Sequence, residues 1–313
     1  MISAIVLNWN GKRFLKECFD SLSRQSFRDY ELIMVDNGST DGSKEFMRDN
    51  FPLVKMIALE KNMGFCRAMN AGIKSAKGEF IALFNNDLAA DKDWMSEMHT
   101  ALENNPDTGI CASKVLFYKE PNKINSAGDL FSIRGEAHNR GFGQENDGRY
   151  NTEEFVFGAT AAACIYRRSM LEDVGLFDED FFNTYEDMDL SFRAHLAGWK
   201  CLYLPKAVVF HHWLGTIGFF SSMNIFYMSK NNLNILVKNM PLKLIRKYAF
   251  IILKKHLEID SGMALRGSLP AFIKGKMCYL QQLPKMLGKR NSILKNMKIS
   301  LKELDGLLEK VKL

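Results

Sequence analysis

The sequence predicts an α/β protein built on a mainly parallel central sheet with helices on both faces. Two observations support this prediction. Strand-like and helix-like runs alternate through residues 1–90, an order that is typical of doubly wound sheets. Small polar residues follow each strand-like run, at the carboxyl ends where such sheets bind their ligands. We therefore expect a ligand site along one edge of the sheet.

The elements of the first half follow from hydrophobic periodicity. Four apolar, partly β-branched runs predict strands over residues 2–7, 31–35, 54–59 and 80–84. Apolar residues at helical spacing predict helices over 14–22, 64–76 and 92–101. A further helix is expected after residue 40, where Ser39 or Thr40 can cap its start. No Gly-rich phosphate loop interrupts this pattern, which argues against a conventional dinucleotide or ATP site.

The second half is less regular. Residues 114–155 are rich in glycine, asparagine and charge, and predict a long irregular insertion suited to covering a site. Apolar order returns over residues 155–166, where Gly158 and Ala159 permit close approach of backbone or ligand. We then expect a helix over 188–197, strand segments that end before a histidine pair, and helices to the end of the chain.

Composition narrows the classes of protein. Six cysteines without short paired spacing indicate reduced thiols in a cytoplasmic protein, with neither a disulfide frame nor a zinc site. Because the chain starts on a strand-like run, we expect no signal peptide. It contains no apolar run of about 18 residues or more, which argues against a membrane-spanning helix.

Charge divides the chain into two parts. Residues 238–313 carry 17 Lys and Arg against 5 Asp and Glu, so residues 1–237 have a net charge of −6. We predict a main domain over 1–237, followed by a basic helical region over 238–313. No aromatic or zinc-finger pattern accompanies the basic residues, so we expect no nucleic acid. Attraction to an anionic membrane surface explains the basic charge at least as well as nucleic acid does.

The basic region allows three arrangements. Lys and Arg stand beside apolar residues over 245–257 and 269–290, a composition that suits helices lying on an anionic leaflet. Apolar residues from Leu294 to Val311 step by three and four, which predicts a heptad seam and a homo-oligomer through these helices. Packing on the catalytic domain is the third arrangement, and the sequence does not choose among them.

Two acidic segments predict chemistry. Glu186, Asp187 and Asp189 put three carboxylates into four positions, and their mutual repulsion requires metal ions, positive partners or a reaction that uses a base. Asp87 ends a second polar segment, Asn85-Asn86-Asp87, directly after a strand. Helix capping is the alternative role for Asp87 and Asp187. Together they predict an enzyme that holds a metal-bound leaving group at one point and deprotonates a nucleophile at another.

Six ordered motifs resemble family 2 glycosyltransferases with the GT-A fold. They are residues 4–10, VDNGSTDGS (35–43), NMGFCRAMNAGI (62–73), FNND (84–87), GLFDEDFFNTYEDMDLSFR (175–193) and the histidine pair after a strand. Within that family the chain is most similar to the bacterial rhamnosyltransferase-like branch. The resemblance implies that residues 1–237 form the catalytic domain, with a nucleotide-binding half up to about residue 110 and an acceptor half beyond it. The resemblance implies inverting transfer of a sugar, with rhamnose the favoured one, from a nucleotide diphosphate to a hydroxyl of a cell-surface glycan or lipid-linked precursor. The alternatives are another UDP-sugar or dTDP-sugar donor, a noncatalytic glycan-binding scaffold, and a sugar-nucleotide nucleotidyltransferase.

The resemblance also implies residue roles. Asp187 matches the catalytic base, with Glu186 as the second candidate. Asp87 and His211 match ligands of Mg²⁺ or Mn²⁺, with His212 as the alternative because the histidine is doubled. The expected nucleotide-sugar site consists of Leu7, Asn8, Asn10, Asp36, Asn37, Asn62, Phe65, Arg67, Asn70, Asn85, Asn86, Gly158, Ala159 and Lys230. The enzyme is then expected to be cytoplasmic, or peripheral on the inner face of the membrane.

Overall fold

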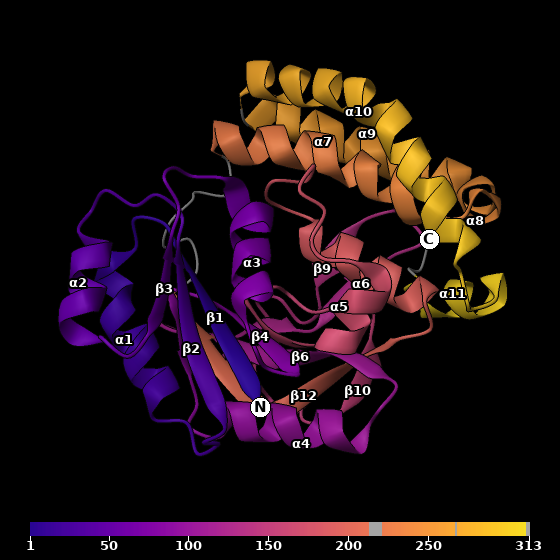
Figure 1. The fold of residues 1–313 in the computed structure, drawn as a ribbon. Coiled ribbons are helices and arrows are strands. Elements are labelled where there is room, and N and C mark those ends of the chain that lie inside the picture. Colours follow the sequence, from indigo (N-terminus) through magenta and orange to yellow (C-terminus); the bar gives the residue numbers. More distant parts are fainter. Residues whose placement is uncertain (213–220, 267, 311–313) are drawn as a thin grey trace.

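The computed structural model describes residues 1–212, 221–266 and 268–310. Its centre is a sheet with the strand order β10-β12-β6-β11-β4-β1-β2-β3, to which β5 and β7 add at β12 and β6 (Figure 1). The strands β4, β1, β2 and β3 run parallel to their neighbours, as do β6 and β12, whereas β11 runs antiparallel between β4 and β6. The predicted α/β class with a mainly parallel sheet is confirmed.

The first half of the chain forms its elements where periodicity places them. In chain order these are β1 (Ile2–Asn8), α1 (Lys12–Ser23), β2 (Tyr30–Asp36), α2 (Ser43–Asn50), β3 (Lys55–Ala58), α3 (Gly64–Ser75), β4 (Phe80–Asn85), β5 (Leu88–Ala90) and α4 (Trp94–Asn104). Each predicted strand lies within one residue of the observed one at both ends. The local signal was sufficient here because each strand is a short, buried apolar run between polar turns.

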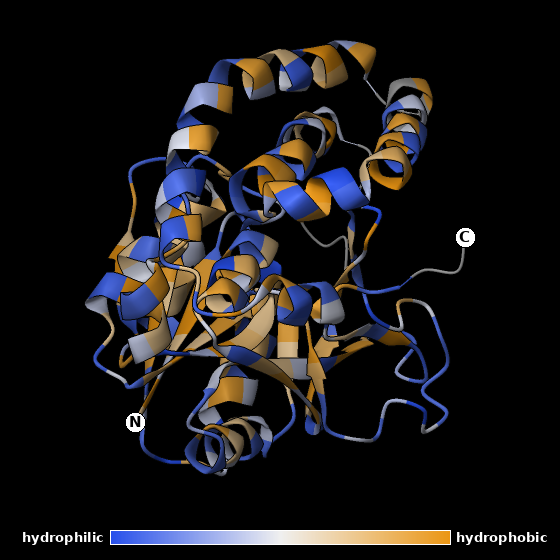
Figure 2. Cartoon of the chain, turned by 90° about the vertical axis from the view of Figure 1, so that its right-hand side faces the viewer, coloured by the Kyte–Doolittle hydropathy of each residue, from blue (hydrophilic) through white to orange (hydrophobic). Residues whose placement is uncertain are grey.

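Helices cover both faces of the sheet because strand side chains alternate between them. Ile5 of β1 packs with the face that holds α3, whereas Ala4 and Val6 pack with the face that holds α1 and α4. On α1 the residues at helical spacing, Leu15, Cys18, Phe19 and Leu22, are all buried. Figure 2 shows the resulting arrangement, in which largely hydrophobic strands lie between helices of mixed character.

The insertion predicted to be irregular contains short strands. After β6 (Thr108–Phe117) come β7 (Ile124–Ala127), β8 (Asp129–Phe131), β9 (Ala137–Asn139) and β10 (Glu154–Val156). β8 and β9 form a separate antiparallel hairpin. The insertion is therefore less irregular than expected, because strands of three or four residues are too short to show a period in the sequence.

The chain then adds two strands and two helices that carry much of the site. These are β11 (Ala163–Arg167), α5 (Arg168–Val174), α6 (Glu186–Leu196) and β12 (Lys200–His211). β12 includes both predicted strand segments and passes through an irregularity between Leu204 and Val208. The helix predicted over 188–197 is present as α6, but it begins two residues earlier, at the acidic cluster.

Helices follow, as expected, in the described part of the C-terminal region. They are α7 (Ser222–Asn239), α8 (Leu242–Lys247), α9 (Ala249–Arg266), α10 (Leu269–Lys295) and α11 (Leu301–Leu307), and α7, α9 and α10 form a layer at the top of Figure 1. The predicted domain boundary at residue 237 falls inside α7. No helix in the described ranges is long and apolar enough to cross a membrane.

The continuous heptad helix from Leu294 to Val311 was a wrong prediction. α10 ends at Lys295, and the separate helix α11 begins with a capping box at Ser300. Leu304 and Leu308 of the predicted seam are buried in the core of the catalytic domain. Val311 lies outside the described residues. Burial on the chain's own core explains this spacing, so the seam is not available to a second copy.

Candidate active site

Buried polar side chains join the carboxyl ends of β1, β2 and β4. The register of β1 and β2 places Asn8 opposite Asp36, and Asn8 Nδ2 donates to Asp36 Oδ1 at 3.1 Å. Asn86 Nδ2 donates to Asn8 Oδ1 at 2.6 Å, and the backbone N–H of Ser39 donates to Asp36 Oδ2 at 3.0 Å. These bonds fix the loops that follow three strands, so the site edge is preorganised.

The other strand-end residues hold the neighbouring turns. Asn10 accepts from the backbone N–H of Thr40 at 2.8 Å, and Asn37 Nδ2 donates to Asn62 Oδ1 at 3.0 Å. Leu7 lies opposite Asn85 in the β1–β4 pair. The structure thus brings to one edge the predicted residues Leu7, Asn8, Asn10, Asp36, Asn37, Asn62, Asn85 and Asn86.

Three predicted nucleotide-site residues on α3 contact a different segment, 177–179. Asn70 exchanges hydrogen bonds with the backbone of Phe177, at 2.9 and 3.1 Å. Arg67 Nε donates to Glu179 Oε2 at 2.8 Å, and Phe65 packs edge-on against Phe177. These contacts connect α3 to the chain that leads into the acidic cluster.

Asp87 and His211 lie together beyond the ends of β4 and β12. The distance from His211 Nε2 to Asp87 Oδ2 is 3.5 Å, and both side chains are largely buried. The other ring nitrogen, Nδ1, faces Asn125 Oδ1 at 3.1 Å. Since Oδ1 is an acceptor, Nδ1 carries the proton in the neutral ring, and the Nε2 lone pair then faces the Asp87 carboxylate. Two acceptors that face each other require a cation between them or a proton on the ring.

The second histidine of the pair is engaged elsewhere. His212 Nε2 lies 2.9 Å from Glu17 Oε2, and its ring stacks on Tyr118 with 3.8 Å between centroids. Tyr118 in turn donates to Glu17. The structure therefore places only the first of the two imidazoles beside Asp87.

The acidic cluster begins α6. Asp187 Oδ1 accepts from the backbone N–H of Met188 at 2.8 Å, and Oδ2 accepts from that of Ala161 at 3.2 Å. Burial raises the pKa of Asp187, although these two hydrogen bonds lower it. Glu186 is only 6% exposed, and burial together with the charge of Asp187 raises its pKa well above the usual range.

An unusual backbone leads into this helix. Phe182, Thr184 and Tyr185 have φ values of 64°, 72° and 72°, in the left-handed region that costs non-glycine residues free energy. Buried Asn231 of α7 compensates, because its Nδ2 lies 2.8–2.9 Å from the carbonyl oxygens of Phe181, Asn183 and Thr184. Helix α7 thereby holds the strained segment in place.

Lys230, predicted for the nucleotide-sugar site, also contacts this segment. Its Nζ donates to the carbonyl oxygen of Asp180 at 2.6 Å, and burial lowers its pKa. The side chain is almost fully buried. In this structure it therefore supports the loop together with the adjacent Asn231.

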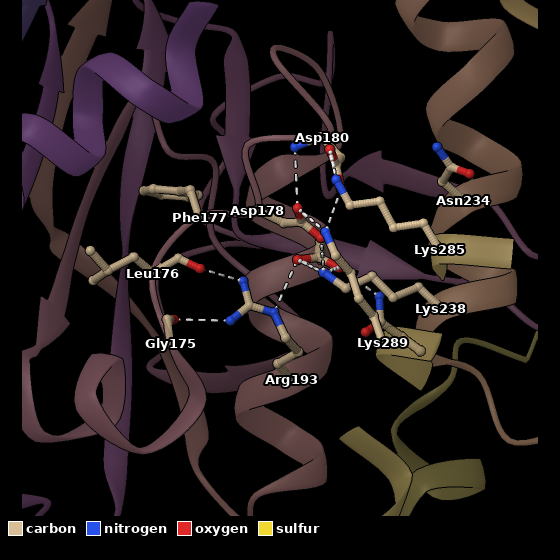
Figure 3. A network of polar contacts seen from close by, with 12 residues as sticks. Gly175, Leu176, Phe177, Asp178, Asp180, Arg193, Asn234, Lys238, Lys285 and Lys289 are labelled. Atoms are coloured by element: carbon tan, nitrogen blue, oxygen red, sulfur yellow. Dashed lines mark hydrogen bonds and ion pairs between the residues drawn. The ribbon is translucent and has the colours of Figure 1, made fainter. Parts of the chain in front are cut away.

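A buried ionic network joins the acidic segment to the C-terminal helices (Figure 3). Asp189, fully buried, accepts from Arg193 Nε at 3.0 Å, Lys238 Nζ at 2.8 Å and Asn239 Nδ2 at 2.8 Å. Lys238 also pairs with Asp178 at 2.7 Å. Although burial alone would raise the pKa of Asp189, the charges of Lys238 and Arg193 lower it. The third carboxylate of the cluster is therefore neutralised by the basic region.

A hollow of about 260 Å³ opens beside Asp187. The β8–β9 hairpin forms one wall and segment 183–188 another. Asp129, at the start of β8, lines this hollow with Asp187 although 58 positions separate them. Sequence reasoning missed Asp129 because it lies in the stretch without periodicity, next to a glycine, where an aspartate resembles an ordinary turn residue.

The predicted pair Gly158–Ala159 lies behind this hollow. The backbone of Gly158 exchanges hydrogen bonds of 2.8 and 3.0 Å with that of Asp129. A Cβ at Gly158 would come within 2.7 Å of Ser191 Oγ on α6. The close approach expected here is thus between the β8 strand, this segment and α6.

Solved structures share this fold. Residues 1–349 of S. aureus TarS, solved with UDP, superpose with a TM-score of 0.60 at 17% identity, over 94% of this chain and 88% of that one. GalNAc-T7, solved with UDP, GalNAc and Mn²⁺, gives 0.60 at 15% identity, over 76% of this chain and 48% of that one. At these identities the likeness establishes the GT-A fold.

The sequence establishes the family. Residues 3–175 match the model of Glycosyl transferase family 2, which is more than half of the chain, and the protein belongs to that family. Among curated relatives, poly-beta-1,6-N-acetyl-D-glucosamine synthase of Staphylococcus epidermidis is 27% identical over 66% of this chain and 48% of its own length. The N-acetylglucosaminyl-diphospho-decaprenol L-rhamnosyltransferase of Mycobacterium tuberculosis is 25% identical over 68% of this chain and 76% of its own length.

The extent of these matches differs between relatives. The chain spans about half of the S. epidermidis synthase and 24% of a further relative, an uncharacterized protein of Sinorhizobium fredii. Family membership therefore applies to the matched catalytic region.

Proposed function

We propose that this protein transfers a sugar from a nucleotide diphosphate donor to a hydroxyl of a cell-surface glycan or lipid-linked precursor, with inversion at the anomeric carbon. The observation that carries the proposal is Asp187, whose carboxylate is oriented by two backbone N–H groups and lines a hollow large enough for an acceptor. A noncatalytic protein that kept only the fold would not need such a fixed, partly accessible carboxylate.

In the proposed reaction Asp187 is the general base. The acceptor oxygen attacks the anomeric carbon while its proton moves to Asp187, and the bond to the diphosphate breaks with its electron pair on the leaving oxygen. A single displacement of this kind inverts the anomeric centre. The raised pKa of Asp187 suits this task, because a base works best with a pKa near the operating pH. A positioned base contributes on the order of 10²–10⁴ in rate.

We propose that Asp87 and His211 hold Mg²⁺ or Mn²⁺ together with the donor diphosphate. The facing carboxylate and imidazole lone pair fit a cation, and the Nδ1 contact to Asn125 is the outer hydrogen bond typical of metal-bound histidine. No group of three or more His, Cys, Asp or Glu that could hold a metal occurs in the described ranges. Diphosphate and water would complete the coordination, and the bound ion would neutralise charge on the leaving group.

For the donor we propose dTDP-rhamnose, with UDP-sugars as the alternative. The name of the M. tuberculosis relative supports rhamnose. Asp36 remains the candidate acceptor for a pyrimidine N–H or a ribose hydroxyl, in the strand-end group with Asn8. Arg67, Asn70 and Lys230 would support the donor site from outside it, because their polar atoms already bind other groups of the protein.

A donor screen tests the proposed function. Purified protein is incubated with dTDP-rhamnose and with UDP-sugars and GDP-sugars, with and without excess EDTA, and released nucleoside diphosphate is measured. We expect one donor to be hydrolysed in a metal-dependent way. Asp187→Asn should abolish most of this turnover, whereas Asp20→Asn, an exposed matched change on α1, should not. Absence of turnover for every donor would favour a noncatalytic scaffold.

We also propose that the basic helical region docks on an anionic membrane. Leu253 and Leu257 of α9 and Ile273, Met277 and Leu280 of α10 are each about half to two-thirds exposed, at helical spacing on their helices. Apolar side chains exposed at helical spacing are a feature of surfaces that bind partners or membranes. Ion pairs within the protein limit which lysines of this region are available to bind anionic lipid. Among the described residues no acid lies within ion-pair distance of Lys254 and Lys274, whereas Lys255 pairs with Glu136 and Lys289 with Asp178.

Vesicle binding tests the docking proposal. Leu257→Glu with Leu280→Glu should release the protein from phosphatidylglycerol vesicles, and binding of the wild type should weaken as salt rises because exposed charges are screened. Leu53→Glu, a fully exposed leucine of the catalytic domain, is the matched control. Equal binding of the double variant and the control would exclude this surface.

A further inference from the structure

The hollow beside Asp187 has the chemistry of a sugar subsite. Its walls combine Asp129, Asn139 and His138 from the β8–β9 hairpin with Asp187 and Glu186 from α6. Its volume of about 260 Å³ lies just below the roughly 300 Å³ at which pockets for drug-sized ligands begin. One sugar ring therefore fits this space better than an oligosaccharide.

Two buried carboxyl groups in the hollow each have one oxygen without a hydrogen-bond partner among the described residues. Glu186 Oε2 is buried with no hydrogen bond to any residue that the structure describes. Asp129 is 5% exposed, and its Oδ1 accepts from Asn139 Nδ2 at 2.7 Å and from Ser126 Oγ at 3.2 Å. No described residue bonds its Oδ2. Buried polar atoms normally have partners, so Glu186 Oε2 indicates a ligand that supplies one. The unbonded Oδ2 of Asp129 belongs to the same hollow and is available to that ligand.

The charge of the hollow restricts that ligand. Three carboxyl groups line it, and no lysine or arginine is among the described residues that do so. A uronate or phosphate would meet carboxylates without a compensating cation, whereas sugar hydroxyls donate to carboxylate oxygens and accept from protonated ones.

We propose that the hollow is the subsite for the acceptor sugar, that this sugar is uncharged, and that Asp129 holds one of its hydroxyls so that a neighbouring hydroxyl lies against Asp187. This inference rests on the proposed function. Asp129 is the positioning group, since it would bind the acceptor without taking the transferred proton.

The hydrogen bonds of Asp129 agree with a protonated side chain. Burial and the charge of Asp187 raise the pKa of Asp129 to about 8, so at neutral pH Oδ1 accepts two hydrogen bonds and Oδ2 carries the proton. The other titratable groups around it are Glu186 and Tyr185 in the lining of the hollow, His138, which pairs with Glu309 at 3.1 Å, and the buried thiols of Cys164 and Cys201. Above about pH 8 Asp129 loses its donor, and acceptor binding should weaken.

The test separates acceptor binding from chemistry. With the donor identified in the screen, kcat and the acceptor KM are measured between pH 6 and 9.5 for nitrophenyl glycosides of rhamnose, glucose and N-acetylglucosamine and for nitrophenyl glucuronide. We expect Asp129→Ala to raise the acceptor KM about tenfold. Asp129→Asn, which keeps a neutral donor, should keep a KM near that of the wild type and lose its rise above pH 8. The glucuronide should be the poorest acceptor.

Two controls accompany these variants. Asp147→Ala changes an exposed aspartate of the same insertion that does not line the hollow, and should leave the acceptor KM unchanged. Melting temperature and calorimetric binding of the nucleoside diphosphate establish that each variant is folded.

The outcomes distinguish the two proposals. If the wild type turns over no nucleotide sugar, the proposed function fails and the subsite fails with it. If the wild type transfers sugar but Asp129→Ala keeps the acceptor KM within twofold, or the glucuronide matches the neutral glycosides, the subsite is overturned while the proposed function stands. Donor hydrolysis with no transfer to any neutral glycoside also counts against the subsite.

Discussion

Replacing Lys238 with methionine tests how strongly the basic region supports the active site. Lys238 Nζ contacts Asp189 and Asp178 at 2.7–2.8 Å, and all three side chains are at least nine-tenths buried. Methionine keeps the length of the apolar stem and removes the charge. Asp189 would keep Arg193 and Asn239 as partners.

The expected loss of stability follows from burial. Removing one partner of a buried ion pair costs about 3–5 kcal/mol because a charge is left without its counterion. Since each carboxylate keeps other donors, we expect the lower end, about 3 kcal/mol. At about 2–4 °C per kcal/mol for proteins of about this size, the melting temperature should fall by roughly 6–12 °C.

The matched control is Lys200→Met. Lys200 pairs with Asp107 at 2.5 Å, but both side chains are about half exposed, and exposed pairs contribute about 0–1 kcal/mol. Thermal melting of both variants and the wild type measures the difference. Equal melting temperatures for Lys238→Met and Lys200→Met would refute the reasoning that this network supports the fold.

The same network predicts a pH dependence of stability. The cations lower the pKa of Asp178 and Asp189 in the folded state, despite the opposing effect of burial. A lowered folded-state pKa contributes stability that is present above the unfolded value, near 4, and lost as pH falls below it. Lys238→Met should therefore reduce the loss of stability between about pH 4 and 2. If Lys238→Met loses as much stability as the wild type between about pH 4 and 2, Lys238 does not lower the pKa values of these carboxylates.

Two further predictions concern the reacting groups. Asp87→Ala and His211→Ala should each remove metal-dependent turnover, whereas His212→Ala should retain most of it, as titration of activity with Mn²⁺ would measure; full wild-type activity in excess chelator would exclude the metal. Asp187→Asn should lower kcat at least about a hundredfold with nucleotide binding retained by calorimetry. If Glu186→Gln does more damage than Asp187→Asn, Glu186 is the base.

Local sequence signals predicted the half of the fold that local forces define. The strands over 2–7 and 80–84 and the helix over 64–76 are amphipathic or buried runs bounded by polar turns, so their periods survive in the sequence. The strand-end asparagines and aspartates were predictable for the same reason, because parallel strands bring their carboxyl ends to one edge. The acidic cluster was visible as an electrostatic anomaly.

The sequence by itself thus determined the α/β class, the edge of the sheet where the polar strand-end residues gather and the segment that carries the carboxylates. Only the tertiary structure decided that His211 rather than His212 faces Asp87, that Lys238 neutralises Asp189, and that Asp129 joins Asp187. The members of each contact are separated by many positions, and their approach depends on how whole elements pack. Periodicity reports which side of an element is buried, but not which group on another element it meets there.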